Sequence, residues 1–468
     1  MRGIAIFLIL VFASITSFAG GKDAYLIKVK LNGLKDTVCY LGNHFGDKQY
    51  IRDTARIDSK GNAVFKGDKK LDGGIYLIIM PSKKYFEIIV NDDQDFAVET
   101  DTLEFIKNAK ITGSEENKLF FDYLNFVSKK HTEVTPYRAL YDKNKGKDSA
   151  KFYLDKINTI DKEVKDYKIN HQNKYPQHVI TAIFKATKEI DIPETPKLAN
   201  GRPDSTFSYR YYKAHFFDNI DFSDDRLLRT PIFHQKLEQY MKNMILQIPD
   251  SINKEADMII AKAKKGNKEI FKYCVWYITN TYETSNIMGM DAVFVHMAEN
   301  YYTYDQAFWV DSTQIFKIRD RARILKPLLI GKVAPNLTMF DDLGKVQSLH
   351  VQKSPYTILL FWDPDCGHCK KSMPFVKEAY DKLKTRGVGV FAVCTEVELD
   401  KWKKYIEENK LDWVNVADAE FRTNFRAIYD ITSTPQIYIL NSKKEIIAKK
   451  IGAEQLEEFM ERELKNKK

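Results

Sequence analysis

The hydrophobic pattern changes its period twice along the 468 residues, and the first part has the pattern of short strands. Over residues 20–114, apolar or alternating runs are separated by turn residues such as Asn32-Gly33 and Asp72-Gly73-Gly74. Runs of this length and spacing are typical of an antiparallel sandwich. The expected strands are Tyr25–Leu31, Val38–Leu41, Ala63–Phe65, Ile75–Met80, Phe86–Val90 and Phe96–Glu99. We therefore expect an N-terminal all-β sandwich over residues 20–114.

Residues 115–326 carry apolar positions at the spacing of α-helices. The pattern begins with Leu119, Tyr123, Phe126 and Val127. Later segments with helical spacing are Leu237–Met244, Ala256–Ala263, Ile270–Ile278, Met288–Tyr301 and Tyr304–Ile324. The pattern predicts a central all-α bundle of about eight helices. Because no repeat of fixed period is visible, a helical-repeat solenoid is not supported.

Two neighbouring segments interrupt the helical pattern. The Pro-rich, polar stretch Asp191–Asp204 is expected to be a loop. The stretch Tyr209–Phe222 is dense in aromatic and charged residues. It fits either a surface that binds a partner or an aromatic seam that packs the loop onto the bundle. Aromatic side chains usually bury their area, which favours the seam.

From residue 327 to residue 468, strand and helix patterns alternate. The apolar run Tyr356–Phe361 predicts a buried strand. The apolar positions after it recur three and four residues apart, which places them on one face of a helix. That face consists of Cys369, Met373, Val376, Tyr380 and Leu383. A later helix is expected over Leu399–Asn409. The alternation predicts a C-terminal α/β domain over residues 327–468.

The sequence Cys366-Gly367-His368-Cys369 stands where this strand pattern gives way to the helix pattern. Residues three apart on a helix are neighbours, so the two sulfurs can form or break a disulfide without a change of fold. A thiol at a helix N-terminus faces unpaired N–H groups and the positive end of the helix dipole. Both favour the thiolate, which is the attacking species.

From about Gly331 to Lys468 the sequence resembles a thioredoxin-fold protein of the TlpA/ResA-like (AhpC/TSA-related) branch. The resemblance rests on the Cys-x-x-Cys motif, on Pro374 inside the helix that follows, and on Pro435 just before a short apolar strand. It implies a thioredoxin fold, and an X-Pro bond at Pro435 that is cis and faces the cysteines. Exported multidomain relatives of this kind carry a β domain and a helical insert before the thioredoxin domain.

The resemblance also implies roles for individual residues. Cys366, nearer the helix start, is the expected nucleophile, and Cys369 is the thiol that resolves the mixed disulfide. His368 is expected to favour the Cys366 thiolate. Extended peptide substrates are expected to bind along Thr434 and Pro435 and near Trp362. With this tetrapeptide, we expect a reduction potential between about −270 and −180 mV, nearer the upper value.

The sequence departs from the family pattern at two positions. Asp365 replaces the tryptophan that usually precedes the first cysteine, and its carboxylate either caps the helix or opposes thiolate formation at Cys366. Leu360 stands where thioredoxin has a buried aspartate that accepts the proton of the resolving thiol. Either Glu396 or water is expected to take that role.

Composition narrows the possible functions. The 73 basic and 64 acidic residues give a formal net charge of +9, which is mild for this length, and no nucleic-acid-binding motif is visible. His296 and Glu299 are spaced as half of a metal site, but no second half is apparent, so no metal is expected. Nothing in the sequence implies a cofactor.

Three cysteines remain besides the motif. Cys39 and Cys274 lie among apolar neighbours and are expected to be buried. Cys394 ends an apolar run that we place in the strand beside the one leading to Cys366, so it is either a third thiol near the motif or a buried residue. Residues 1–19 combine a basic start, a short apolar core and small residues, which predicts a secretory signal peptide. No later run is long enough to span a membrane, so a soluble periplasmic protein is expected.

These observations predict an exported thiol–disulfide oxidoreductase that acts on proteins carrying a disulfide or a dithiol. An unidentified electron donor or acceptor is implied. Two other functions remain open. The large β and helical parts fit a binding or scaffold protein of the cell envelope with a regulatory or vestigial redox domain. A peroxidase is disfavoured, because no Thr or Ser hydroxyl stands three residues before Cys366.

Overall fold

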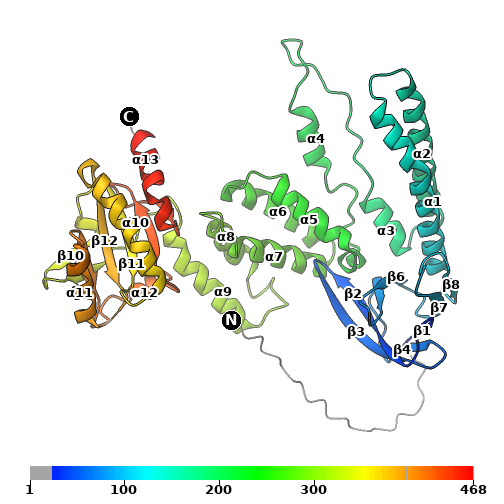
Figure 1. The fold of residues 1–468 in the computed structure, drawn as a ribbon, viewed down its shortest axis with the longest axis horizontal. Helices are drawn as coiled ribbons and strands as arrows, with labels where there is room; N and C mark the ends of the chain where they lie inside the picture. The colour runs from blue at the N-terminus through cyan, green and yellow to red at the C-terminus, as the bar shows by residue number, and fades with distance from the viewer. Residues whose placement is uncertain (1–23, 397, 467–468) are drawn as a thin grey trace, which may run out of the picture. The chain divides into compact units, whose positions relative to one another are not determined.

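The structure, a computed structural model, describes residues 24–396 and 398–466. The predicted signal peptide at residues 1–19 lies outside them. The chain divides into two compact units, Met1–Glu238 and Gln239–Lys468, and Figure 1 labels most of their helices and many of their strands. The expected combination of β strands, then helices, then a thioredoxin-like α/β domain is confirmed.

The first unit begins with two four-stranded sheets, ordered β4-β1-β7-β8 and β3-β2-β5-β6. The strands are β1 (Tyr25–Asn32), β2 (Thr37–Phe45), β3 (Lys48–Ile57), β4 (Asn62–Gly67), β5 (Gly74–Ile79), β6 (Tyr85–Val90), β7 (Asp95–Asp101) and β8 (Lys110–Thr112). The strands pair antiparallel as expected, except that β1 and β7 run parallel. The sequence reading also missed β3, which pairs along the whole of β2.

Alternate residues of these strands build the core of the first unit. Ile27, Val29 and Leu31 of β1 are buried, and the residues between them are half-buried or exposed. Such alternation buries one face of a strand and leaves the other toward water. Phe120 and Phe121 of the first helix pack into the same core.

In chain order, nine α-helices of the described residues follow the sandwich and precede the C-terminal α/β domain. They are α1 (Glu115–Lys143), α2 (Ser149–Lys174), α3 (Val179–Ala186), α4 (Phe207–His215), α5 (Pro231–Asn243), α6 (Pro249–Lys265), α7 (Lys268–Glu283), α8 (Asp291–Tyr301) and α9 (Ser312–Leu325). The helix expected over Tyr304–Ile324 starts only at Ser312, because Asp311 caps it with a capping box to Gln314. No helix within residues 24–396 and 398–466 is both long and apolar enough to cross a bilayer.

Only the second part of the aromatic segment Tyr209–Phe222 shows the packing expected of a seam, and partner binding by the first part stays a prediction. No residue of α4 is buried, and Tyr209 is 53% exposed. Immediately after α4, Phe216 and Phe217 are buried and their rings meet edge to face. Phe222 continues this stack from Phe217 to Phe233. The buried part of the seam therefore begins at Phe216, while α4 is half-buried to exposed and contributes Tyr212, whose ring meets that of Phe216 edge to face.

The C-terminal part of the second unit is a seven-stranded sheet ordered β10-β9-β13-β12-β11-β14-β15. Its strands are β9 (Thr338–Asp341), β10 (Val346–Ser348), β11 (Tyr356–Trp362), β12 (Val388–Cys394), β13 (Val414–Ala417), β14 (Gln436–Leu440) and β15 (Ile446–Lys449). Its helices are α10 (Gly367–Leu383), α11 (Leu399–Asn409), α12 (Phe425–Ile428) and α13 (Leu456–Asn466). β11, β12 and β13 are parallel, so their carboxyl ends share one edge of the sheet.

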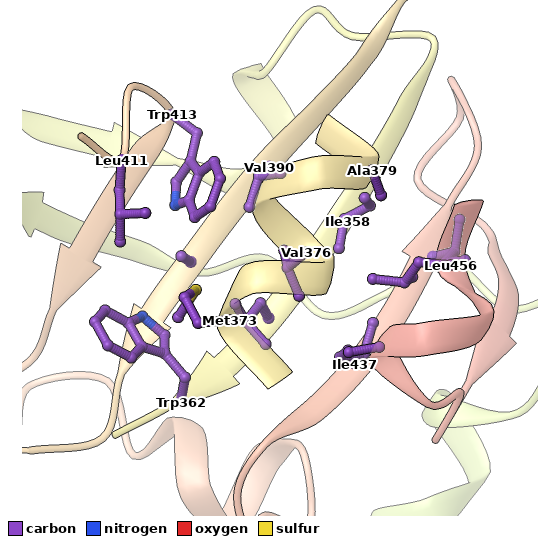
Figure 2. Packing of buried hydrophobic residues seen from close by; sticks show 14 of the residues in the cluster. Ile358, Trp362, Met373, Val376, Ala379, Val390, Leu411, Trp413, Ile437 and Leu456 are labelled. Carbon is purple, nitrogen blue, oxygen red and sulfur yellow. The ribbon is translucent and has the colours of Figure 1, made fainter. Parts of the chain in front are cut away.

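Both faces of this sheet are covered. On one face, α10, α11 and α13 pack over the central strands, and Figure 2 shows Ile358 and Val390 meeting Val376 and Ala379 of α10. On the other face, Phe361 of β11 packs against α12 and the segment that precedes β9. All seven residues of β11 are buried, as expected for a central strand covered on both sides.

Candidate redox site

The strand β11 and the helix α10 together present the two cysteines at the carboxyl edge of the sheet. Cys366 is the N-cap of α10 and is half-buried, whereas Cys369 lies one turn into the helix with 2% of its surface exposed. Pro374 lies inside the same helix, as in the sequence pattern. No disulfide joins the two cysteines in this structure. The outer thiol is therefore open to solvent and the inner one is covered.

Local hydrogen bonding favours the thiolate at Cys366. Burial by itself raises the pKa of this thiol, but several contacts outweigh it and hold the pKa below its ordinary value. They come, in order of size, from the backbone N–H of Cys369, from the side chain of Thr434, from the Cys369 thiol and from the backbone N–H of His368. Two of these donors are unpaired N–H groups of the first helical turn.

The environment of Cys369 has the opposite effect. Burial raises the pKa of this thiol to about 12, and the neighbouring Cys366 adds to the rise. The backbone N–H of Asp363 donates to Cys369 Sγ over 3.4 Å but only partly offsets the burial. The pair therefore holds one thiol that ionises easily and one that stays protonated.

The loop before β14 lies against the nucleophile candidate. The peptide bond between Thr434 and Pro435 is cis. Cys366 Sγ lies 3.5 Å from the carbonyl oxygen of Thr434 and donates to it. A pocket of about 340 Å³ adjoins this loop, and it is lined by Ser372 of α10, by Pro435 and by the segment Lys450–Glu454, among others. The loop thus contacts Cys366 through Thr434 and lines the pocket through Pro435, whereas neither cysteine lines the pocket.

The surroundings of His368 and Trp362 differ from those that the sequence led us to expect. His368 is exposed on the first turn of α10, and its backbone N–H is the group that acts on Cys366. Trp362 ends β11 with 1% of its surface exposed, and its ring meets Tyr405 of α11 at 5.1 Å. Trp362 therefore supports the site from beneath, and its side chain offers little surface to a substrate.

Asp365 does not cap α10, although the sequence left that possibility open. No side chain caps this helix, and Asp365 Oδ2 instead accepts a hydrogen bond of 2.9 Å from Lys401 Nζ. Lys370 Nζ lies 3.9 Å from the other carboxylate oxygen. The hydrogen bond from Lys401 is the main reason that the pKa of Asp365 is lowered. The sequence reading did not single out Lys401.

Cys394 and Glu396 follow the neighbouring strand β12. Cys394 is the register partner of Trp362, so it does lie on the strand beside the motif. It is 1% exposed, and burial raises the pKa of its thiol to about 12. The backbone N–H of Glu396 donates to Cys394 Sγ over 3.4 Å. No base for Cys369 is identified by these contacts, so the role of Glu396 stays a prediction.

The other residues considered in the sequence have structural partners. His296 Nε2 lies 2.7 Å from Asp257 Oδ1, and Glu299 pairs with Lys326 at 2.8 Å. Cys39 and Cys274 are buried in the cores of their units. Among the residues that the structure describes, no three His, Cys, Asp or Glu side chains are grouped as metal ligands.

Family models match three parts of the chain. Residues 329–467 match a family described as Redoxin. Residues 25–120 match a domain of unknown function (DUF4369), and residues 161–326 match another (DUF5106). The match to Redoxin covers the part of the chain that contains both cysteines and the Thr434–Pro435 loop.

A solved structure resembles the same C-terminal part of the chain. It is a domain of a possible thiol-disulfide isomerase from Cytophaga hutchinsonii ATCC 33406, with 41% sequence identity. The match covers 30% of this chain and 96% of that domain, with a TM-score of 0.29.

Curated relatives match this part as well. The chain is 29% identical over 136 residues to the thiol-disulfide oxidoreductase ResA of Bacillus cereus, covering 28% of this chain and 78% of that protein. It is 34% identical over 115 residues to the sporulation thiol-disulfide oxidoreductase A of Bacillus subtilis (strain 168), covering 23% of this chain and 68% of that protein. The curated relatives and the Redoxin match assign the chain through its C-terminal domain: it belongs to the thioredoxin-like thiol–disulfide oxidoreductase family.

Proposed function

We propose that this protein exchanges disulfides with protein substrates through Cys366 and Cys369. The Cys366 thiolate attacks one sulfur of a substrate disulfide, and the other substrate sulfur leaves as a thiolate. Cys369, after losing its proton, attacks Cys366 Sγ and releases the second substrate sulfur. The protein's dithiol is thereby oxidised to a disulfide, and the substrate's disulfide is reduced to two thiols. The reverse sequence oxidises a substrate dithiol.

One observation carries this proposal: the two thiols of the pair ionise very differently. The pKa of Cys366 is lowered beneath the ordinary value, whereas burial raises the pKa of Cys369 to about 12. A half-buried thiolate can reach a substrate, and a protonated inner thiol does not compete with it for the substrate. The helix N-terminus supplies the asymmetry, because its N–H groups point at the outer sulfur.

The proton of Cys369 needs an acceptor during the second step. We assign it to water or to Glu396, the two candidates that the sequence allows. His368, on the exposed first turn, is assigned an electrostatic contribution to the Cys366 thiolate. Neither assignment changes the order in which the sulfurs react.

Alkylation over a range of pH tests the proposed nucleophile. Only a thiolate reacts with iodoacetamide, so the rate at Cys366 should rise with pH through its folded pKa and level off above it. Because that pKa is lowered, the midpoint should lie below that of a cysteine in an unstructured peptide measured in the same buffer. Cys369 should stay unmodified at neutral pH, since its pKa is about 12. Peptide mass spectrometry after timed quenching gives both rates.

The same alkylated protein provides the functional readout. Protein blocked at Cys366 alone should no longer accelerate the reduction of insulin by dithiothreitol, whereas a sample carried through without iodoacetamide should. Full activity in the blocked protein, or modification that reaches Cys369 first, would contradict the proposal.

We infer that an extended substrate segment lies along Thr434 and Pro435 and enters the adjoining pocket. Strand-like hydrogen bonding to the loop gives affinity with little sequence selectivity. The pocket of about 340 Å³ beside Pro435 is large enough for a side chain of the substrate. Its hydroxyl and charged lining, which includes Ser372 and Lys450, suits a polar side chain.

Filling this pocket should weaken the binding of protein substrates but not the reaction of small disulfides. Ser372→Trp should raise KM for insulin about tenfold, because an indole would occupy space that the substrate needs. Exchange with a small disulfide such as oxidised glutathione should change less than about twofold, because it needs only the sulfur. Lys371→Trp, at an exposed position of the same helix turn outside the pocket, is the matched control. Equal effects of the two substitutions on insulin would remove the pocket from the proposal.

We place this activity in the periplasm, with disulfide- or dithiol-bearing proteins as partners. The predicted signal peptide at residues 1–19 motivates the location, and the family implies thiol-bearing partners. Recovery of the chain in an osmotic-shock fraction, with its N-terminus at Gly20, is the expected result. The reduction potential of the Cys366–Cys369 pair in a glutathione buffer decides the direction: a value near that of thioredoxin marks a reductant, and one well above it marks an oxidant or isomerase.

A further inference from the structure

Asp365 places a carboxylate directly before the cysteine that we propose as the nucleophile. Asp365 adjoins Cys366 in sequence, and a carboxylate at that position opposes the formation of a thiolate next to it. Its side chain is about half exposed and stays charged, because its pKa is lowered by the hydrogen bond from Lys401. Yet the pKa of Cys366 is also lowered. The hydrogen bonds to Cys366 account for that direction, and two lysines close to Asp365 bear on its opposing charge.

Lys401 is placed to do this from the neighbouring helix. Its Nζ lies 2.9 Å from Asp365 Oδ2, on the opposite carboxylate oxygen from Lys370, which is 3.9 Å away. Lys401 stands in the first turn of α11 and also pairs with Glu398 at 2.9 Å. The ammonium is therefore held between two carboxylates beside the redox motif.

The position of Lys401 is fixed by the residue that follows it. Trp402 is 1% exposed and anchors α11 in the core beneath the sheet edge. One residue away along the helix surface, Lys401 consequently points out of the core, toward the loop that carries Asp365. Asp363 organises the other side of this loop, because its Oδ1 accepts the backbone N–H of Asp365 over 2.7 Å. The loop before Cys366 is thus held at two points.

We propose that Lys401 is a positioning residue of the redox site, which neutralises the carboxylate of Asp365 and ties the loop bearing Cys366 to helix α11. The proposal rests on the proposed function only in that Cys366 is the reacting thiol. Lys401 does not touch the substrate. It acts by keeping the net charge of the Asp365–Lys401 pair at zero next to the sulfur.

The test measures the Cys366 thiol in the full-length protein by alkylation across pH, with no substrate present. Lys401→Met removes the closer cation and leaves Asp365 with Lys370 at 3.9 Å alone, so the alkylation rate at about pH 6 should fall about two- to fivefold, the range expected for one exposed charge. Asp365→Asn removes the negative charge next to Cys366, while Lys401 keeps its pairing with Glu398, and should raise the rate by a similar factor. The double variant Asp365→Asn/Lys401→Met should return close to the wild-type rate.

Two controls separate charge balance from general damage. Lys401→Arg keeps the charge and should keep the rate. Lys404→Met removes an exposed lysine of the same helix, one that pairs only loosely with Glu408 at 3.8 Å, and should change nothing. Melting temperatures of all five variants should match the wild type within a few degrees, since exposed pairs contribute little to stability.

The proposal is overturned if Lys401→Met behaves like Lys404→Met, or if the double variant keeps the full shift of Lys401→Met. Because alkylation reads the sulfur directly, these outcomes do not depend on catalytic exchange. If wild-type protein failed to reduce insulin while the variants still shifted as stated, the proposed function would fail and the role of Lys401 would stand.

Discussion

Cys366→Ala should reduce the rate of insulin reduction by at least about a thousandfold, because no other described thiol combines exposure with a lowered pKa. The remaining cysteines cannot substitute for it. Burial raises the pKa of Cys369 and of Cys394 to about 12, so each is protonated at neutral pH. The rate is read from insulin turbidity in the presence of dithiothreitol.

Cys369→Ala and Cys394→Ala complete this experiment. Without Cys369 the mixed disulfide at Cys366 cannot be resolved, so covalent complexes with substrate should accumulate on non-reducing gels and disappear with reductant. Cys394→Ala should keep activity within about twofold, because its thiol is covered and protonated. Accumulation of complexes in Cys394→Ala rather than in Cys369→Ala would reassign the resolving thiol.

Trp402→Ala should destabilise the C-terminal domain by about 3–5 kcal/mol, the range for removing a buried large aromatic side chain. Trp402 is 1% exposed and packs in the cluster that joins α10, α11 and the central strands. Native-state hydrogen exchange of peptides from β11 and β12 measures the loss locally, which suits a chain of several domains. Lys404→Ala, exposed on the same helix, should change protection by less than about 0.5 kcal/mol.

If Trp402→Ala lowered the hydrogen-exchange protection of β11 and β12 no more than Lys404→Ala does, α11 would not be packed as described. A large loss would also predict a change at the active site. The helix that Trp402 anchors carries Lys401 and also Tyr405, whose ring meets Trp362 beneath the cysteines.

Elements with a clean hydrophobic period could be predicted from the sequence. The helix expected over Leu399–Asn409 is found with the same bounds, because Trp402 and Ile406 mark one apolar face among charged residues. β3 was missed for the opposite reason. Only the end of Lys48–Ile57 alternates, where Ala55 and Ile57 are buried, whereas Tyr50 and Ile51 are both exposed. Pairing with β2 therefore defines most of this strand.

Within the site too, residues marked by a local sequence pattern could be predicted, and residues that depend on long-range contacts could not. The two cysteines and Pro435 could be identified because short motifs with fixed spacing mark them. Lys401 could not, because its contact with Asp365 spans 36 residues and depends on how α11 packs onto the sheet. Its only trace in the sequence is a lysine next to a buried tryptophan, and many lysines have such a neighbour. Long-range pairs between exposed charges carry no local pattern.

Because the other thiols are buried, the native protein should react with thiol reagents at a single position. Cys39, Cys274, Cys369 and Cys394 are all covered by packed side chains. One equivalent of a maleimide dye or an activated-thiol resin should therefore couple at Cys366 alone, without prior removal of any cysteine. A column charged in this way would orient every molecule identically, with its thioredoxin-like domain attached to the matrix.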